Sequence, residues 1–265
     1  MIMEREWKRS RKSLLIWCLI LSGLIIWLLS IFPQFADQQE SMEQLFEAYP
    51  ESMREMFQMN ELSLGTLMGF YGIEVYMMIT LLGSIYAAIL ASNMLAKEEG
   101  DKTAEFLLSK PVTRGQVVMQ KLALILLNIF TLNAAAAFAS FIGFQFAGDH
   151  KVPVKTFALL IAAAFLLHLT FAALAFLLSS FMKRTRNTLA ISIGIVIVTY
   201  FFQLMSGLSD SIEPLKYASP FYYTDAAPII NENTLGPIHV IVLLSVSLVS
   251  IIGAFMIYKK KDISV

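Results

Sequence analysis

Six long apolar runs dominate the sequence and assign the chain to the membrane. Of 265 residues, 57% are hydrophobic and only 15% are charged. A soluble core cannot bury that much apolar surface in a chain of this length, so lipid is the expected solvent. We therefore expect an all-α integral membrane protein, a single transmembrane domain over residues 1–265, with spans at about 14–32, 68–95, 117–146, 156–182, 188–205 and 238–258.

The amino-terminal segment combines basic residues with a first apolar run. Residues 14–32 would form a helix roughly 28 Å long, about one hydrocarbon thickness. The preceding residues 1–13 hold Trp7 among five basic side chains, which predicts an amphipathic interfacial helix on the cytoplasmic face. A cleaved signal peptide is the alternative, but the run is long for one and no small-x-small cleavage pattern follows it.

Two polar intervals predict short helices outside the spans. Residues 33–67 hold seven Asp or Glu against Arg54, with apolar residues at helical spacing on both sides of Pro50. We expect an extracytoplasmic helical segment that packs on the outer ends of the spans; a lid or receptor surface is the alternative. Residues 206–237 hold four prolines, which favour short re-entrant or interfacial helices between the last two spans.

The distribution of basic residues predicts the orientation. With both termini inside, sixteen of the twenty Lys and Arg lie on inner segments and four on outer ones. Basic residues concentrate on the cytoplasmic side of membrane proteins, so both termini are expected in the cytoplasm.

Motifs for catalysis or cofactor binding are missing from the sequence. No glycine is followed by lysine, which excludes a P-loop, and neither an H-E-x-x-H nor a G-x-S-x-G motif occurs. The single cysteine, Cys18, can form no internal disulfide. The net charge is zero, so no basic field suggests nucleic acid as a partner.

Two polar residues fall inside the predicted spans. Glu74 lies early in the second span, where it either reaches headgroup water or contributes to a translocation path. His168 lies midway along the fourth span, where a hydrogen bond to a neighbouring helix competes with a role in the path. Small residues such as Gly143 and Ala147 suit close helix packing within the chain or between two chains.

Residues 96–116 form the longest polar interval on the predicted cytoplasmic side. Acidic residues come first, an apolar Phe106-Leu107-Leu108 group follows, and Pro111 ends the expected short helix. Such a segment is either an ordinary solvated loop or a docking surface for a soluble partner.

This interval resembles a segment of known transporters. Glu105-Phe-Leu-Leu-Ser-Lys-Pro-Val-Thr-Arg114, preceded by Glu98, Glu99 and Thr103, is similar to the loop between the second and third spans of ABC-2 type ABC transporter permeases. The pattern there is acidic residues followed by G-T-x-E-x-L-L-S-x-P-V-[S/T]-R. Lys102 replaces the usual glycine here, with Gly100 two positions earlier. The basic start Glu6-Trp7-Lys8-Arg9 and the six-span layout resemble the family as well.

The resemblance implies a permease subunit of an exporter in the cell membrane, which is not an enzyme by itself. Two such chains, identical or different, would form the pathway, and each would dock a separate ATPase subunit that holds ATP and Mg. The chain itself would bind no cofactor. The implied docking residues, on a cytoplasmic coupling helix, are Glu98, Glu99, Thr103, Glu105, Phe106, Leu107, Leu108, Ser109, Pro111, Val112 and Arg114.

A stand-alone secondary transporter or channel is the alternative function. Such proteins often carry internal repeats with matching intramembrane charges, and neither is evident in this sequence. A membrane-embedded hydrolase built on Glu98 and Glu99 is disfavoured, since these residues lie at the cytoplasmic end of a span. The sequence leaves the transported substrate open.

Overall fold

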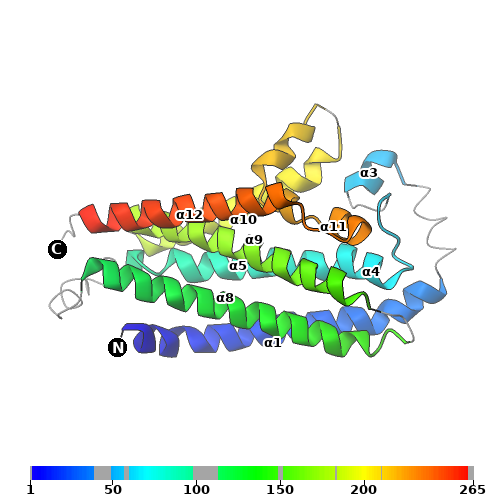
Figure 1. Ribbon diagram of the computed structural model, residues 1–265, viewed down its shortest axis with the longest axis horizontal. Coiled ribbons are helices and arrows are strands. Elements are labelled where there is room, and N and C mark those ends of the chain that lie inside the picture. Colours follow the sequence, from blue (N-terminus) through cyan, green and yellow to red (C-terminus); the bar gives the residue numbers. More distant parts are fainter. Residues whose placement is uncertain are drawn as a thin grey trace.

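The computed structural model describes residues 2–38, 49–56, 60–97, 113–148, 152–182, 184–209 and 211–261. Within these ranges the regular structure is entirely helical (Figure 1). The helices are α1 (Ile2–Asp37), α3 (Glu51–Met56), α4 (Leu67–Phe70), the π-helical turn η1 (Tyr71–Tyr76), α5 (Met77–Ser92), α8 (Arg114–Phe144), α9 (Val154–Phe181), α10 (Thr185–Ser206), the 3-10 turns η2 (Glu213–Ala218) and η3 (Tyr222–Thr224), α11 (Ala226–Glu232) and α12 (Pro237–Lys260).

The prediction of six membrane-spanning helices is confirmed in the described part of the chain. Six helical stretches there are long and apolar enough to cross a bilayer. The second is composite, because α4, η1 and α5 follow one another without a gap from Leu67 to Ser92. For the second to sixth spans the helix ends lie within a few residues of the predicted ones.

The first span differs from the prediction. The sequence suggested a separate interfacial helix over residues 1–13, whereas α1 runs unbroken from Ile2 to Asp37. The reason is local, because residues 2–22 contain neither proline nor glycine and nothing ends the helix. Pro33 lies near its far end, and the helix extends one turn beyond it.

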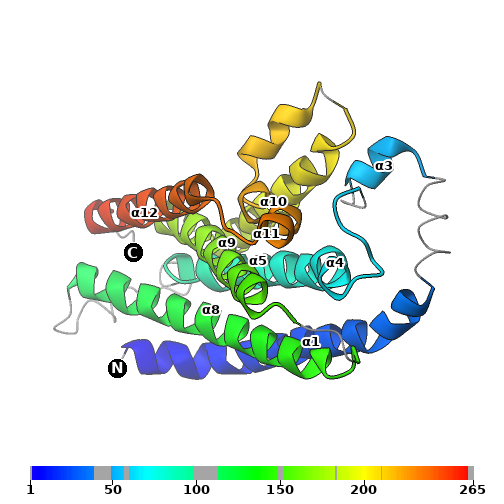
Figure 2. The same ribbon diagram turned by 45° about the vertical axis from the view of Figure 1, so that its right-hand side comes forward.

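The long helices surround α9. It contacts α5, α8, α10 and α12, while α1 packs along α8 on the other side of the bundle (Figures 1 and 2). Small residues permit these approaches: a Cβ added at Gly143 of α8 would lie 2.4 Å from Leu29 Cδ1 of α1. Gly143 therefore serves packing within the chain.

Two hydrophobic clusters occupy the two halves of the bundle. One gathers α1, α4, η1, α11 and the second half of α8 around Phe70 and Tyr71. The other gathers the first half of α8, the end of α9 and parts of α10 and α12 around Phe171 and Phe176.

Hydrogen bonds between helices satisfy polar side chains inside the bundle. The hydroxyl groups of Tyr71 and Ser140 lie 3.0 Å apart. Tyr86 donates to Asn128 Oδ1 at 3.0 Å and so links α5 to α8. Such groups would be costly in hydrocarbon without partners.

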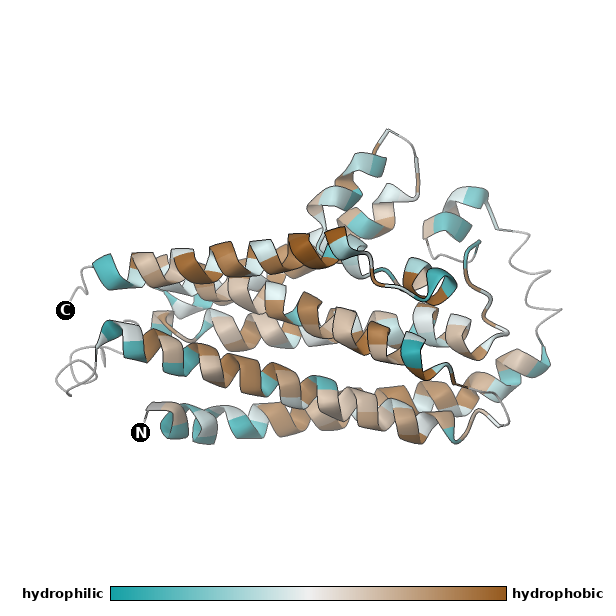
Figure 3. Cartoon of the chain, viewed as in Figure 1, coloured by the Kyte–Doolittle hydropathy of each residue, from teal (hydrophilic) through white to brown (hydrophobic). Residues whose placement is uncertain are grey.

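Different segments of the chain lie at the two ends of the bundle. Both termini lie at the end where α8 begins, and α3 and α11 lie toward the opposite end (Figure 1). Most of the brown, apolar colour in Figure 3 falls along the middles of the long helices, and teal gathers at their ends. This arrangement agrees with a layout in which both termini share one side of a membrane.

The intervals outside the spans form short helices where they are described. The structure has η2, η3 and α11 between the last two spans, as the prolines predicted. In the acidic interval 33–67, α3 begins directly after Pro50. Residues 39–48 and 57–59 of that interval lie outside the described residues.

Candidate functional site

The predicted docking segment is described at its edges. Of the eleven docking residues, Arg114 lies in the described part of the chain. Glu98, Glu99, Thr103, Glu105, Phe106, Leu107, Leu108, Ser109, Pro111 and Val112 lie outside it. The geometry of the flanks, Lys97 on one side and Thr113 on the other, is therefore what the structure adds.

The chain enters α8 directly after this segment, and the start of that helix is capped. Thr113 is the N-cap of α8: its Oγ1 accepts a hydrogen bond from the amide of Gln116 at 3.2 Å. In return, the amide of Thr113 donates to Gln116 Oε1 at 3.0 Å. This capping box satisfies two amides that a helix start leaves without partners, so α8 begins at Arg114.

Arg114 binds the carboxyl-terminal end of the last span. Its Nη1 donates to the main-chain oxygens of Tyr258, Lys259 and Lys261 at 3.4, 3.2 and 2.6 Å. These carbonyls lie at the end of α12, where a helix lacks internal donors and carries partial negative charge. The guanidinium group therefore caps α12 from the start of α8.

The entry to the segment is tied to α1. Lys97 Nζ forms an ion pair with Glu6 Oε2, and the Glu6 side chain is only 2% exposed. Arg5 Nη2 lies 3.4 Å from the other carboxylate oxygen of Glu6. Nearby, the fully buried Lys121 of α8 donates its Nζ proton to the carbonyl of Met94. Polar contacts thus join α1, α5, α8 and α12 at one end of the bundle.

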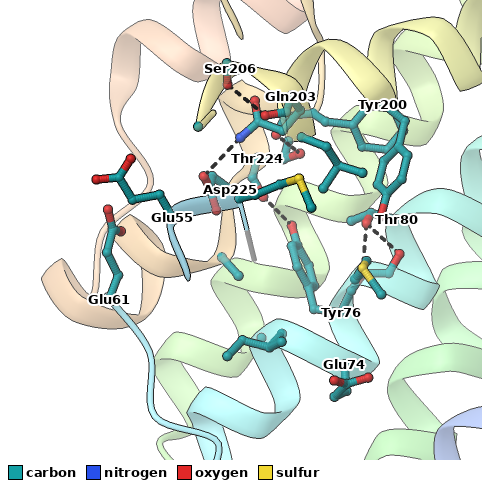
Figure 4. Close-up of a pocket in the computed structure, with 18 residues that line it drawn as sticks. Glu55, Glu61, Glu74, Tyr76, Thr80, Tyr200, Gln203, Ser206, Thr224 and Asp225 are labelled. Carbon is teal, nitrogen blue, oxygen red and sulfur yellow. Dashed lines mark hydrogen bonds between the residues drawn. The ribbon is translucent and has the colours of Figure 1, made fainter. Parts of the chain in front are cut away.

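A cavity of about 430 Å³ lies at the other end, between η1, α10 and α11 (Figure 4). A second cavity of about 700 Å³ shares part of its wall and extends toward α3 and η2. The first cavity is lined by Glu55, Met56, Glu61, Gly72, Ile73, Glu74, Tyr76, Met77, Thr80, Tyr200, Gln203, Leu204, Ser206, Gly207, Phe221, Thr224, Asp225 and Ala226.

The lining of this cavity contains both carboxylates and aromatic rings. Asp225 is the N-cap of α11, where its Oδ1 accepts from the amide of Ala227 at 3.3 Å and its Oδ2 accepts from Gln203 Nε2 at 3.3 Å. The hydroxyl of Tyr76 donates to the carbonyl of Thr224 at 3.0 Å. These bonds hold α11 against the second and fifth spans and so shape the cavity.

Glu74 is the carboxylate of the cavity that lies within a span. It is half-buried, and in the described part of the chain no ion pair or hydrogen bond of its side chain is observed. It lies on the π-helical turn η1. One extra residue per turn redirects side chains, and such turns occur often at functional sites. Gly72 on the same turn leaves room for α11, because a Cβ there would lie 2.7 Å from Ile230 Cδ1.

Comparison with known families decides the identity of this six-span chain. The family described as ABC-2 family transporter protein matches residues 1–263. The chain belongs to the ABC-2 transporter family. A search of curated proteins finds no match to it. Membership confirms the resemblance to ABC-2 type permeases and makes the protein an ABC transporter permease, a multi-pass membrane component of transport that is not catalytic alone.

His168 of this permease does not line the cavity. Its ring is 1% exposed and lies between α5, α8 and α9. Nδ1 lies 3.0 Å from Asn133 Nδ2, and Nε2 lies 3.1 Å from the carbonyl oxygen of Ile79. A neutral imidazole that accepts at Nδ1 and donates at Nε2 fits both partners. Of the two predicted pathway residues, the structure therefore brings Glu74 alone to the cavity.

The remaining cavity residues gave no signal in the sequence. Tyr200, Gln203 and Asp225 are ordinary residues of two different segments until the fold brings them together with η1. Within the described residues of the permease, no group of three or more His, Cys, Asp or Glu could hold a metal ion.

Proposed function

We propose that the chain is the membrane-spanning subunit of an ATP-driven exporter. Two such chains, identical or different, form the pathway, and a separate ATPase subunit drives each of them. The match of the ABC-2 transporter family over residues 1–263 carries the proposal. The absence of a P-loop from the sequence supports it, because the nucleotide then has to bind elsewhere.

Residues 98–112 are the proposed docking site for the ATPase. Phe106, Leu107 and Leu108 would fill a groove on the partner, since buried apolar anchors carry most of the interface energy. Charged groups would set the register of the contact. These groups are Glu98, Glu99, Glu105 and Arg114, although the guanidinium group of Arg114 is also engaged with α12. ATP and Mg would bind to the partner.

The proposed orientation places both termini and the docking segment in the cytoplasm, in the cell membrane. Lys97, Arg114 and the basic end of α12 lie at the same end as the termini, which supports one common basic side. Residues 1–265 would then form one permease domain.

The outer cavity is the proposed external part of the path. It lies between the second and fifth spans, at the end of the bundle opposite the start of α8. Glu74 supports this role, because an ionisable side chain inside a span that has no ion-pair partner among the described residues is rarely kept for stability.

Purification of the chain from its native membranes tests the docking assignment. The wild-type chain is expected to retain a second polypeptide that hydrolyses ATP. Leu107→Asp should lose that subunit, because a carboxylate cannot be buried in an apolar groove without a partner. Ile263→Asp, an apolar-to-acidic change in the carboxyl-terminal tail, is the matched control and should retain it. Transport by wild-type chain alone would favour a stand-alone transporter instead.

A further inference from the structure

Glu6 and Lys97 connect two segments that are distant in the sequence. Glu6 lies in the second turn of α1, and Lys97 is the last described residue before the docking segment. Their side chains are 2% and 11% exposed, respectively. A carboxylate this buried needs charged partners. Arg5 on the same helix is one of them, and Lys97 is the described partner from outside α1.

A neighbouring surface pair shows what is special about this contact. Glu4 Oε1 and Lys8 Nζ lie 2.9 Å apart on the exposed side of the same helix, four residues apart. That pair can only support α1 itself. Glu6 instead bonds a residue 91 positions away, at the point where the chain leaves the second span.

The buried pair has room to rearrange. It lies on the wall of a cavity of about 440 Å³ between α1, α5 and the start of α10. Ser10, Asn93 and Thr185 also line this cavity and offer alternative hydrogen-bond partners. A movement of Lys97 therefore meets open, polar space rather than a close-packed core.

The other flank of the docking segment is held in a similar way. The guanidinium group of Arg114 donates hydrogen bonds to three main-chain oxygens at the end of α12. Polar contacts thus hold both flanks of residues 98–112: Lys97 is bound to the first span and Arg114 to the last. Among the described residues, Glu6 connects α1 to Lys97 through one ion pair, so one substitution can release that connection.

We infer that Glu6 is a positioning residue that couples movement of the docking segment to α1 through Lys97. The inference rests on the proposed function, because the movement comes from the ATPase. When the ion pair is intact, α1 follows Lys97. When it is absent, the ATPase still docks and hydrolyses ATP, but the first span no longer responds.

Distance measurements on the purified complex of permease and ATPase subunit test this. Spin labels at Asp37→Cys, at the outer end of α1, and at Ser209→Cys, after the end of α10, in a Cys18→Ala background, report on the position of the first span. Mg-ATP with orthovanadate should shift the label distance in the wild-type complex. In Glu6→Gln, the population that shifts should fall about tenfold while ATP hydrolysis and subunit retention persist.

Two further variants make the result decisive. Glu4→Gln removes the same charge two residues away and should behave as wild type. The exchange Glu6→Lys with Lys97→Glu should restore the nucleotide-dependent shift, because it rebuilds the pair. A full wild-type response of Glu6→Gln, or loss of the ATPase subunit from it, would overturn the inference.

The exchange variant also covers failure of Glu6→Gln to fold. An exchange variant that folds and binds the ATPase but shows no shift contradicts coupling through this pair. A wild-type chain that carries no ATPase subunit refutes the proposed function itself, which is a different outcome.

Discussion

The imidazole ring of His168 occupies the space beside the Cα atom of Gly83. A Cβ built on Gly83 would lie 2.3 Å from both Cε1 and Nε2 of His168. The ring cannot retreat freely, because Nδ1 and Nε2 are held by Asn133 and by the carbonyl of Ile79. The histidine therefore joins three helices inside the bundle. Its ring fits against α5 only because residue 83 is a glycine.

Gly83→Ala should destabilise the permease by about 1–3 kcal/mol, the usual cost of overpacking a tight core. The added methyl group forces the ring away from at least one hydrogen-bond partner. Thermal unfolding of the detergent-purified chain measures the effect. Gly23→Ala is the control, since nothing lies within 4 Å of a Cβ at Gly23; equal stability of the two variants would contradict the packing described.

Arg114→Gln should loosen the carboxyl-terminal turn of α12 by about 1 kcal/mol, the scale of a charged group at a helix end. Hydrogen exchange of the amides in residues 256–261 reports this directly. Arg186→Gln, at the exposed start of α10, should leave that exchange unchanged. Unaltered exchange in Arg114→Gln combined with loss of the ATPase subunit would assign the guanidinium to the partner instead.

Glu74→Gln should leave the thermal stability unchanged or raise it, while it impairs transport. An amide costs less than a carboxylate inside a span when no ion-pair partner is near. Asp225→Ala, in the same cavity, should instead lower the stability by about 1 kcal/mol through loss of an N-cap. Thermal unfolding separates the two cases. A destabilised Glu74→Gln would mean that the carboxylate is part of the scaffold.

Helix positions were predictable because they depend on neighbouring residues in the chain. The run from Val154 to Phe181 is mostly apolar, with Lys155 in its first turn, and Pro237 is the first residue of α12, as proline favours. The predicted interfacial helix over residues 1–13 is instead continuous with the first span in α1. Basic residues suggest an interface, but without proline or glycine they do not end a helix.

Roles of individual polar residues were less predictable. Sequence reasoning placed Arg114 in the docking surface, which stays a prediction, and gave no sign that its guanidinium group bonds the end of α12. It named both Glu74 and His168 for the path, and the structure separates them. Lys97 was treated as one charge among several, and its pairing with Glu6 depends on the packing of α1 against the second span.

The number of membrane crossings and the family follow from the sequence alone, because insertion depends on the local free energy of moving each segment into lipid. Which side chains meet is decided elsewhere. Three features join residues that are far apart in the chain. They are the cavity around Glu74, the packing of His168 against Gly83, and the polar contacts of Lys97 and Arg114. Such contacts arise from how six helices pack together, and no single segment encodes that packing.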